Sequence, residues 1–359
     1  MSNVGDMLRL ARQRLGLTQK LAARKLGVAQ PVLSRFENSI SNPDIEFLAK
    51  ASRVYGVPRS FFDFIDPVYG PPVSVHPMTR GKSDVTAREL DMISAELNIR
   101  FIHLRKFLEG IEFTPTNYIP ILDVEQYGTP EKIASVVRAH WGVPPGPIKD
   151  LTRLVERAGV VVGWSKFGGA SVSGVTFRAP GKPPVVLLNK QHPADRVRFT
   201  LAHELGHLVM HRFPTAEMEV EATEFASSFL IPAADIRPSF RGRRITLEVL
   251  ASLKPEWKVA MQALLMRANS LKMLTPNQYR YLWQQISLRG WRLHEPAELD
   301  FAHEIPRVLP SIIRSHLSDL GYSVAELAQL VRIHEDEFVE MYGPVGDQPP
   351  PTPRLRVVT

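Results

Sequence analysis

Residues 198–211 read RFTLAHELGHLVMH, and this segment decides the fold of the region around it. Apolar residues recur through it at helical spacing, which predicts a buried helix that begins near Pro193 and ends at about His211. Two histidines, His203 and His207, stand four positions apart and therefore lie one above the other on one face of that helix. Both imidazoles can reach a single Zn²⁺ from there. The segment predicts a metal site on a buried helix.

The same segment carries a candidate catalytic group. Glu204 follows the first histidine, and in a zinc peptidase of the HExxH type this glutamate accepts a proton from a water that zinc activates for attack on a peptide carbonyl. His211 lies one turn further on, but three ligands on adjacent turns of one helix do not easily surround an ion tetrahedrally. We therefore interpret His211 as a packing or substrate-facing residue, and expect the third ligand from another element. A buried motif that binds no metal is the alternative.

A second helix is expected over residues 219–232, EVEATEFASSFLIP, with several carboxylates near its start, one of which can face the metal. Together with RFTLAHELGHLVMH, this stretch resembles the ImmA/IrrE family of metallopeptidases. The family pattern is HExxH, followed by E-x-x-A-Asn and then Phe-Ala and an apolar run that ends in proline. Thr223 stands where the family usually has asparagine, and a polar side chain at this position is one that can orient a metal ligand.

The resemblance implies a role for each matching residue. His203 and His207 correspond to metal ligands, Glu204 to the general base and Glu219 to the third ligand of a Zn²⁺ ion. Glu221 is the alternative third ligand.

Short apolar runs ahead of the metal helix predict a small sheet. Val160 to Val162 follows a helix that ends at Ala158-Gly159, and Val185 to Leu188 follows two prolines. We expect substrate backbone to add as a strand to the edge formed by the second run, which would place the scissile carbonyl over the zinc.

The N-terminal region has a different pattern, of short amphipathic helices separated by small turns. Thr18 can cap a helix over residues 19–26, Gly27 supplies a turn, and a second helix is expected over residues 30–37. On the second helix, side chains on one face can bond base edges and phosphates in a major groove; they are Gln30, Ser34 and Arg35. The expected small core comprises Leu21, Ala22, Leu26, Val28, Val32, Leu33 and Phe36.

These residues resemble the Cro and cI type of phage-repressor domain, also called the xenobiotic-response-element family. The positions that carry the resemblance are Gln19, Ala22, Gly27, Ser34, Glu37 and Pro43. The resemblance implies that Gln19 also contacts DNA, that a double-stranded operator is the partner, and that the chain forms a homodimer which reads half-sites about one helical turn apart. A helical interaction module with a merely solvated basic face is the alternative.

Composition limits these interpretations. The 359 residues carry a formal net charge of +7, which suits a polyanionic partner. The chain has no cysteine, so disulfides and thiolate-ligated metals are excluded and any metal must be held by His, Asp or Glu. No segment has the pattern of a signal peptide or a membrane span, so we expect a cytoplasmic protein without a membrane partner.

The patterns together predict a mainly α-helical chain with a small α+β part. The expected parts are a five-helix helix-turn-helix domain at 1–65, a linker at 66–84, a connecting helix at 85–118, a zincin-like metallopeptidase domain with a small sheet at 119–240, a helical C-terminal region at 241–345 and a disordered tail at 346–359. The connecting helix has an apolar stripe that we assign to a core rather than to a dimer seam.

The combination predicts a DNA-binding transcriptional regulator with a zinc-dependent endopeptidase domain. Within the resemblance, stand-alone peptidases cleave a repressor of the helix-turn-helix type, so the expected substrate is such a repressor or the chain itself, in a stress or mobile-element response. One alternative is a catalytically silent transcription factor that senses a metal or ligand. Another is an antitoxin or immunity regulator that binds its toxin through the region from Thr246 onward. Glu204, which a pure receptor does not need, favours the active enzyme.

Overall fold

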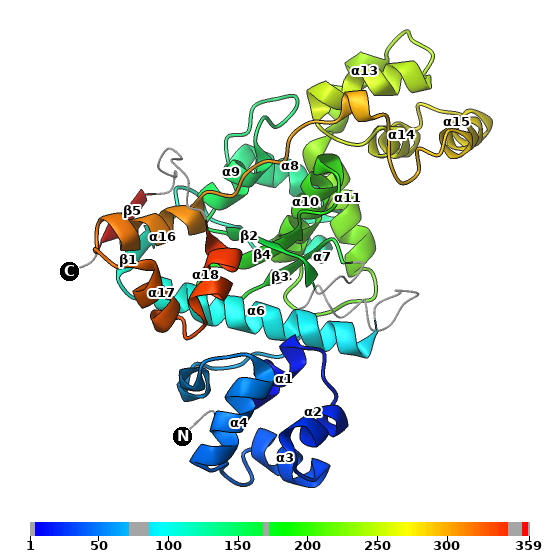
Figure 1. Cartoon of the computed structure of the whole chain (residues 1–359). Helices are drawn as coiled ribbons and strands as arrows, with labels where there is room; N and C mark the ends of the chain where they lie inside the picture. The colour runs from blue at the N-terminus through cyan, green and yellow to red at the C-terminus, as the bar shows by residue number, and fades with distance from the viewer. Residues whose placement is uncertain (1–3, 72–85, 168–171, 344–353, 358–359) are drawn as a thin grey trace. The chain divides into compact units, whose positions relative to one another are not determined.

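The computed structural model describes residues 4–71, 86–167, 172–343 and 354–357. The chain divides into two units, which we describe separately (Figure 1). Unit 1 comprises Met1–Thr114, Lys166–Val172 and Arg307–Thr359, and unit 2 comprises Pro115–Ser165 and Ser173–Pro306. The mainly helical fold expected from the sequence is confirmed. No helix among the described residues is both long and apolar enough to cross a bilayer.

Unit 1 begins with five short helices, the last of them a 3₁₀ helix. They are α1 (Val4–Arg14), α2 (Gln19–Leu26), α3 (Gln30–Glu37), α4 (Ile45–Tyr55) and η1 (Arg59–Asp63). The expected cap at Thr18 is present, because its hydroxyl accepts a hydrogen bond from the backbone N–H of Leu21 at 3.2 Å. Gly27 ends α2 in the left-handed conformation, with φ of 66°, which costs a glycine little. Local sequence therefore fixes both ends of α2.

The core of unit 1 extends beyond these five helices. Helix α6 (Ala87–Phe107) begins at a capping box formed by Thr86 and Glu89, and its apolar stripe is buried, as expected for a core helix. Ala95, Ile99 and Ile102 of α6 belong to the same apolar cluster as the side chains of α1 and α2.

Two residues expected in the core of the small helices are instead exposed. Leu21 is 42% exposed and Val32 is 39% exposed. The buried positions of α2 are Ala22, Ala23 and Leu26, and Leu21 lies outside the stripe that they form.

The C-terminal part of unit 1 is helical as well. Helices α16 (Val308–Ser318), α17 (Val324–Leu330) and α18 (Glu335–Tyr342) follow one another, and α16 contacts α6. Strand β5 (Arg354–Val357) pairs antiparallel with β1 (Ile111–Thr114). The rest of the expected tail, and the expected linker from residue 72 onward, lie outside the described residues.

Unit 2 contains the predicted small sheet, whose strand order is β2-β4-β3. Strand β2 (Val161–Ser165) follows α9 (Leu151–Arg157) and pairs parallel with β4 (Val185–Asn189), while β3 (Gly174–Phe177) pairs antiparallel with β4. The expectation that a substrate strand adds to the edge at Val185 to Leu188 is therefore wrong. These residues form the central strand, and both of its sides are already hydrogen-bonded within the sheet.

Helices cover the sheet and complete unit 2 (Figure 1). They are α7 (Val124–Tyr127), α8 (Pro130–His140), α10 (Ala194–Met210), α11 (Met218–Leu230), α12 (Ala233–Phe240), α13 (Leu247–Trp257), α14 (Met261–Ser270), α15 (Pro276–Leu288) and the short η4 (Ala297–Leu299). Helix α10 contacts strands β3 and β4 on one side and α11 on another, and α11 also contacts α8. The buried side chains of Leu201, Leu205 and Phe225 belong to the large apolar cluster of this unit. The helix that carries the HExxH motif is therefore held by packing on several sides.

Candidate metal centre and DNA-contacting face

Close packing of α10 against α11 depends on a glycine inside the HExxH motif. A Cβ atom at Gly206 would lie 3.1 Å from Cδ1 of Phe225 and 3.3 Å from Cα of Ala222. Because position 206 has no side chain and position 222 has only a methyl group, the two helices can approach closely. This approach brings Glu219, in the first turn of α11, opposite the histidines of α10.

His203, His207 and Glu219 lie together, and one potential ligand atom from each lies within 4.8 Å of the others. The two Nε2 atoms of the histidines are 3.1 Å apart. Oε1 of Glu219 is 3.0 Å from Nε2 of His207, and Oε2 is 3.4 Å from Nε2 of His203. Two imidazole nitrogens and one carboxylate oxygen form a donor set that Zn²⁺ binds well, and three protein ligands leave a position for water or substrate. The residues present fit such an ion.

The cluster is open on one side. The side chain of His207 is 3% exposed, whereas that of His203 is 17% exposed and that of Glu219 is 44% exposed. The exposed side of the cluster leaves the three candidate ligand atoms open to a molecule that approaches from solvent.

The second ring nitrogen of each histidine also has a partner. Nδ1 of His207 lies 3.0 Å from Nδ1 of His211, and Nε2 of His211 lies 2.9 Å from Oε2 of Glu221. His211 therefore links His207 to a carboxylate, a contact that the interpretation as a packing or substrate-facing residue did not include. Since Glu221 is engaged in this chain of contacts, it is Glu219 and not Glu221 that joins the two histidines in the cluster.

On the other histidine, Nδ1 of His203 lies 3.4 Å from Oγ1 of Thr223. Thr223 thus stands beside a candidate ligand, at the position where the sequence pattern departs from the ImmA/IrrE family. Groups that bond the outer nitrogen of a ligating histidine fix its ring orientation and tautomer.

The charges in the cluster favour an ionised Glu219. Burial opposes its ionisation, but hydrogen bonds from His203 and His207 outweigh burial and lower the pKa of Glu219 to about 2. Burial works against protonation of His203, yet Glu219 and Glu204 together raise its pKa. Burial lowers the pKa of His211, and the neighbouring His207 adds to that effect. Perturbed pKa values concentrated in one cluster are typical of functional sites.

Glu204 is buried beside this cluster, with only 3% of its surface exposed. Its Oε2 atom has no hydrogen-bond partner among the residues that the structure describes. Because a buried carboxylate oxygen without a partner is costly, such groups in native proteins call for a functional explanation. The oxygen is available to accept a proton, which is the role expected of Glu204 from the sequence.

The four residues expected to contact DNA lie on or next to α3. Gln30 and Arg35 are exposed, while Ser34 and Gln19 are partly buried. The amide of Gln30 donates a hydrogen bond to Oε1 of Gln19 at 2.8 Å, and Gln19 in turn donates to Oε2 of Glu37 at 2.8 Å. Gln19 therefore holds Gln30 in place at the start of α3. The exposed Val32 lies on the same helix and offers an apolar group of the kind that contacts a thymine methyl.

Glu37 is anchored by an arginine that the sequence interpretation did not single out. Arg12 of α1 donates from Nε to Oε1 of Glu37 at 2.6 Å and from Nη2 to Oε2 at 2.9 Å, and both side chains are buried. No spacing rule marks Arg12 in the sequence, because its partner is distant along the chain and on another helix. The pair connects α1 to the helix that carries residues expected to contact DNA.

Comparisons with known proteins match both domains that carry these residues. Residues 155–269 match the family described as IrrE N-terminal-like domain, a peptidase family, and residues 8–62 match the helix-turn-helix family. The N-terminal region is 39% identical over 59 residues to the HTH-type transcriptional regulator ImmR of Bacillus subtilis (strain 168). That alignment covers 16% of this chain and 46% of the relative, so the chain matches less than half of the relative's length. Both resemblances expected from the sequence are confirmed.

Proposed function

Since the chain carries both a helix-turn-helix transcription-regulator domain and an IrrE-like metallopeptidase domain, we propose that it is a DNA-binding regulator whose second domain is a zinc-dependent endopeptidase. The observation that carries this proposal is the convergence of His203, His207 and Glu219 beside the buried, unpaired oxygen of Glu204. The DNA-binding residues are Gln19, Gln30, Ser34 and Arg35.

The residues of this chain have distinct tasks in the proposed reaction. His203, His207 and Glu219 would hold the ion, and zinc, when bound, supplies Lewis acidity that makes a water a better nucleophile near neutral pH. Glu204 takes the proton of the attacking water on its free carboxylate oxygen and passes it to the leaving amine. His211 and Thr223 orient the two imidazoles through their outer nitrogens.

The proposed substrate is a repressor of the helix-turn-helix type, either a partner protein or a second copy of this chain. The presence of a DNA-binding domain and a peptidase domain on one polypeptide supports this choice, because an operator that binds both regulator and repressor places them at high local concentration. A homodimer that reads two half-sites of the operator is part of the same proposal. Cleavage of the DNA-bound repressor would release the operator.

The first test is the zinc content of the purified chain, measured by mass spectrometry. We expect about one zinc per chain in the wild type and a clear loss in both His203→Ala and Glu219→Ala. Glu224→Ala is the matched control, since Glu224 is an exposed carboxylate on the same helix α11. Retention of zinc in Glu219→Ala together with its loss in Glu221→Ala would transfer the ligand role to Glu221.

The second test is cleavage of a purified helix-turn-helix repressor, or of the chain itself, followed by mass spectrometry of the fragments. Glu204→Gln should lower the cleavage rate by roughly 10²–10⁴-fold, because it removes the general base, while leaving operator binding unchanged. A zinc-loaded wild type that cleaves nothing, together with intact operator binding, would favour a catalytically silent regulator that senses a metal or ligand.

A further inference from the structure

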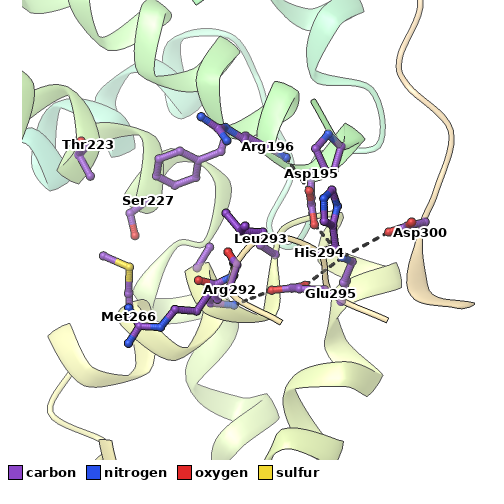
Figure 2. Close-up of a pocket in the computed structure, with 16 residues that line it drawn as sticks. Asp195, Arg196, Thr223, Ser227, Met266, Arg292, Leu293, His294, Glu295 and Asp300 are labelled. Carbon is purple, nitrogen blue, oxygen red and sulfur yellow. Dashed lines mark hydrogen bonds and ion pairs between the residues drawn. The ribbon is translucent and has the colours of Figure 1, made fainter. Parts of the chain in front are cut away.

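A pocket of about 320 Å³ opens in unit 2, lined in part by residues of α10, α11 and α14 (Figure 2). Arg196 and Phe199 of α10 line it and lead to His203 at spacings of three and four residues. On α11, Thr223 and Ser227 line it and follow Glu219 at spacings of four. The pocket therefore continues the helix faces that carry the cluster, and Thr223 belongs to both, since its hydroxyl lies 3.4 Å from His203.

The walls of the pocket include exposed apolar side chains. Met266 of α14 is 49% exposed and Leu293 is 80% exposed, and Phe199 and Ala263 also face the pocket. Figure 2 shows Leu293 between the wall formed by Thr223 and Ser227 and the acidic and basic groups of the opposite wall. Large apolar side chains with this much exposure beside a concave surface indicate a binding site, because burial by a ligand would remove them from water.

The acidic groups of the pocket share one lysine. The ammonium group of Lys254 lies 2.7 Å from Asp195 and 2.9 Å from Glu295, and 3.8 Å from Asp300. Glu295 also accepts hydrogen bonds from the first backbone N–H groups of α14, at Met261 and Gln262. These contacts engage Asp195 and Glu295 within the protein, whereas the side chain of Asp300 is 58% exposed.

Two arginines of the pocket are in the opposite situation. The guanidinium of Arg196 donates to the hydroxyl of Ser173, and that of Arg292 donates to the hydroxyl of Ser287 and lies over the ring of Trp283. Neither guanidinium has an acidic partner within the described ranges. The pocket thus combines an apolar wall with two cations that are free to bind a carboxylate.

We propose that this pocket selects the peptide substrate by receiving a bulky apolar side chain whose neighbouring residue is acidic. The apolar side chain packs against Leu293 and Met266, and the carboxylate binds Arg196 or Arg292. A peptide fits better than a free small molecule because the pocket lies on the faces of α10 and α11 that hold the metal cluster. The inference rests on the proposed endopeptidase function and adds its sequence preference.

Peptide binding to the zinc-loaded Glu204→Gln chain tests the proposal without requiring cleavage. The probes are fluorescein-labelled Gly-Ser decapeptides that contain one adjacent pair in either order: Leu and Asp, Leu and Lys, or Ser and Asp. Fluorescence polarisation should show at least roughly tenfold tighter binding of the Leu and Asp peptides than of the other two sets. Equal binding of all three sets would overturn the proposal.

Variants then assign the selectivity to the pocket. Arg292→Glu should weaken binding of the Leu and Asp peptides about tenfold and reverse the preference in favour of Lys, while Leu293→Ser should remove the preference for Leu. Arg280→Glu, an equal charge change at an exposed position of α15 outside the pocket, should leave both unchanged. If Arg292→Glu and Arg280→Glu behave alike, the site is not this pocket.

The outcome separates the pocket from the proposed reaction. Selective binding that depends on Arg292, with no cleavage by the wild type, would retain the peptide site and refute the endopeptidase. If the cleavage rate does not depend on the charge and size of the residues next to the cleaved bond, the endopeptidase is retained and the proposed role of the pocket is refuted. Binding of octanoate that depends on Arg292, without binding of any peptide, would refute the peptide and assign the pocket to a small anionic amphiphile.

Discussion

The face of unit 1 that we expect to contact DNA and the candidate metal cluster of unit 2 use polar side chains in opposite ways. Gln30 and Arg35 extend from an exposed helix surface above an apolar core, and they can be replaced without opening that core. His207 and Glu204 are buried between packed elements, each 3% exposed, so their replacement disturbs the interior. The difference shows that polar side chains on a surface depend on the core beneath them, whereas buried polar side chains depend on partners within the protein, and Oε2 of Glu204 stands out because it has none among the described residues.

The buried ion pair between Arg12 and Glu37 in unit 1 should have the largest effect on stability. Arg12→Ala leaves the buried carboxylate of Glu37 with the hydrogen bond from Gln19 but without a charged partner, and should cost about 3–5 kcal/mol of folding free energy. Hydrogen–deuterium exchange by mass spectrometry should report lost protection in α1 and α3, while α10 and α11 stay protected. The double variant Arg12→Met with Glu37→Met should recover much of the loss, because it leaves no unpaired charge. Equal loss in the single and double variants would show that packing, and not the charge pair, supports α3.

In unit 2, His211 and Thr223, which contact the outer nitrogens of the two histidines, should affect metal affinity more than stability. His211→Ala removes the link between His207 and Glu221 and should weaken zinc binding about 10–100-fold, as other outer partners of ligating histidines do. Competition with a chromophoric chelator measures the change. Thr223→Val tests the corresponding contact at His203. Unchanged affinity in both variants would make the buried contacts incidental and would weaken the contrast between the two units.

The surface residues of unit 1 should affect operator binding without affecting stability. Arg35→Ala should lower operator affinity about tenfold, which corresponds to the loss of one good base or phosphate contact. Arg280→Ala removes the same charge from an exposed helix of unit 2 and controls for net charge. Electrophoretic mobility shift at two salt concentrations measures both. A change in unfolding temperature for Arg35→Ala would contradict the view that this face is separable from the core.

The folding stability of the two units should depend on pH in modestly different ways. Burial, together with the charges of Arg100 and Arg14, holds the pKa of His103 well below 6.5. The unfolded chain binds a proton at His103 below pH 6.5 and the folded unit does not. The free energy of unfolding of unit 1 should therefore fall by about 1 kcal/mol between pH 6.5 and 5.5. In unit 2, burial opposes protonation of Lys254, but its carboxylate partners raise its pKa, so its contribution is lost only as pH rises above 10.5. Urea unfolding at pH 6.5 and 5.5 measures this change in the wild type. The variant His103→Gln should not show the fall in unfolding free energy at the lower pH.

Local patterns predicted much of the fold and the identity of the candidate site residues. Helix boundaries around Thr18 and Gly27 follow from capping chemistry that involves only neighbouring residues. The spacing of His203 and His207 places both imidazoles on one face of any helix. The apolar stripe of α6 also follows from periodicity alone. These features depend on contacts within a few residues of the chain, so the sequence contains all the information that they require.

Other features depend on which elements meet. A run of valines such as Val185 to Leu188 indicates a buried strand, but pairing on both sides depends on the strand order, which local sequence does not encode. The choice between Glu219 and Glu221 depends on the rotation of α11 against α10, which the packing at Gly206 and Ala222 sets. Residue types and helical periodicity thus determined which chemical groups each helix presents on one face. Only the tertiary structure decided which of those groups converge, because their contacts join atoms that are distant along the chain.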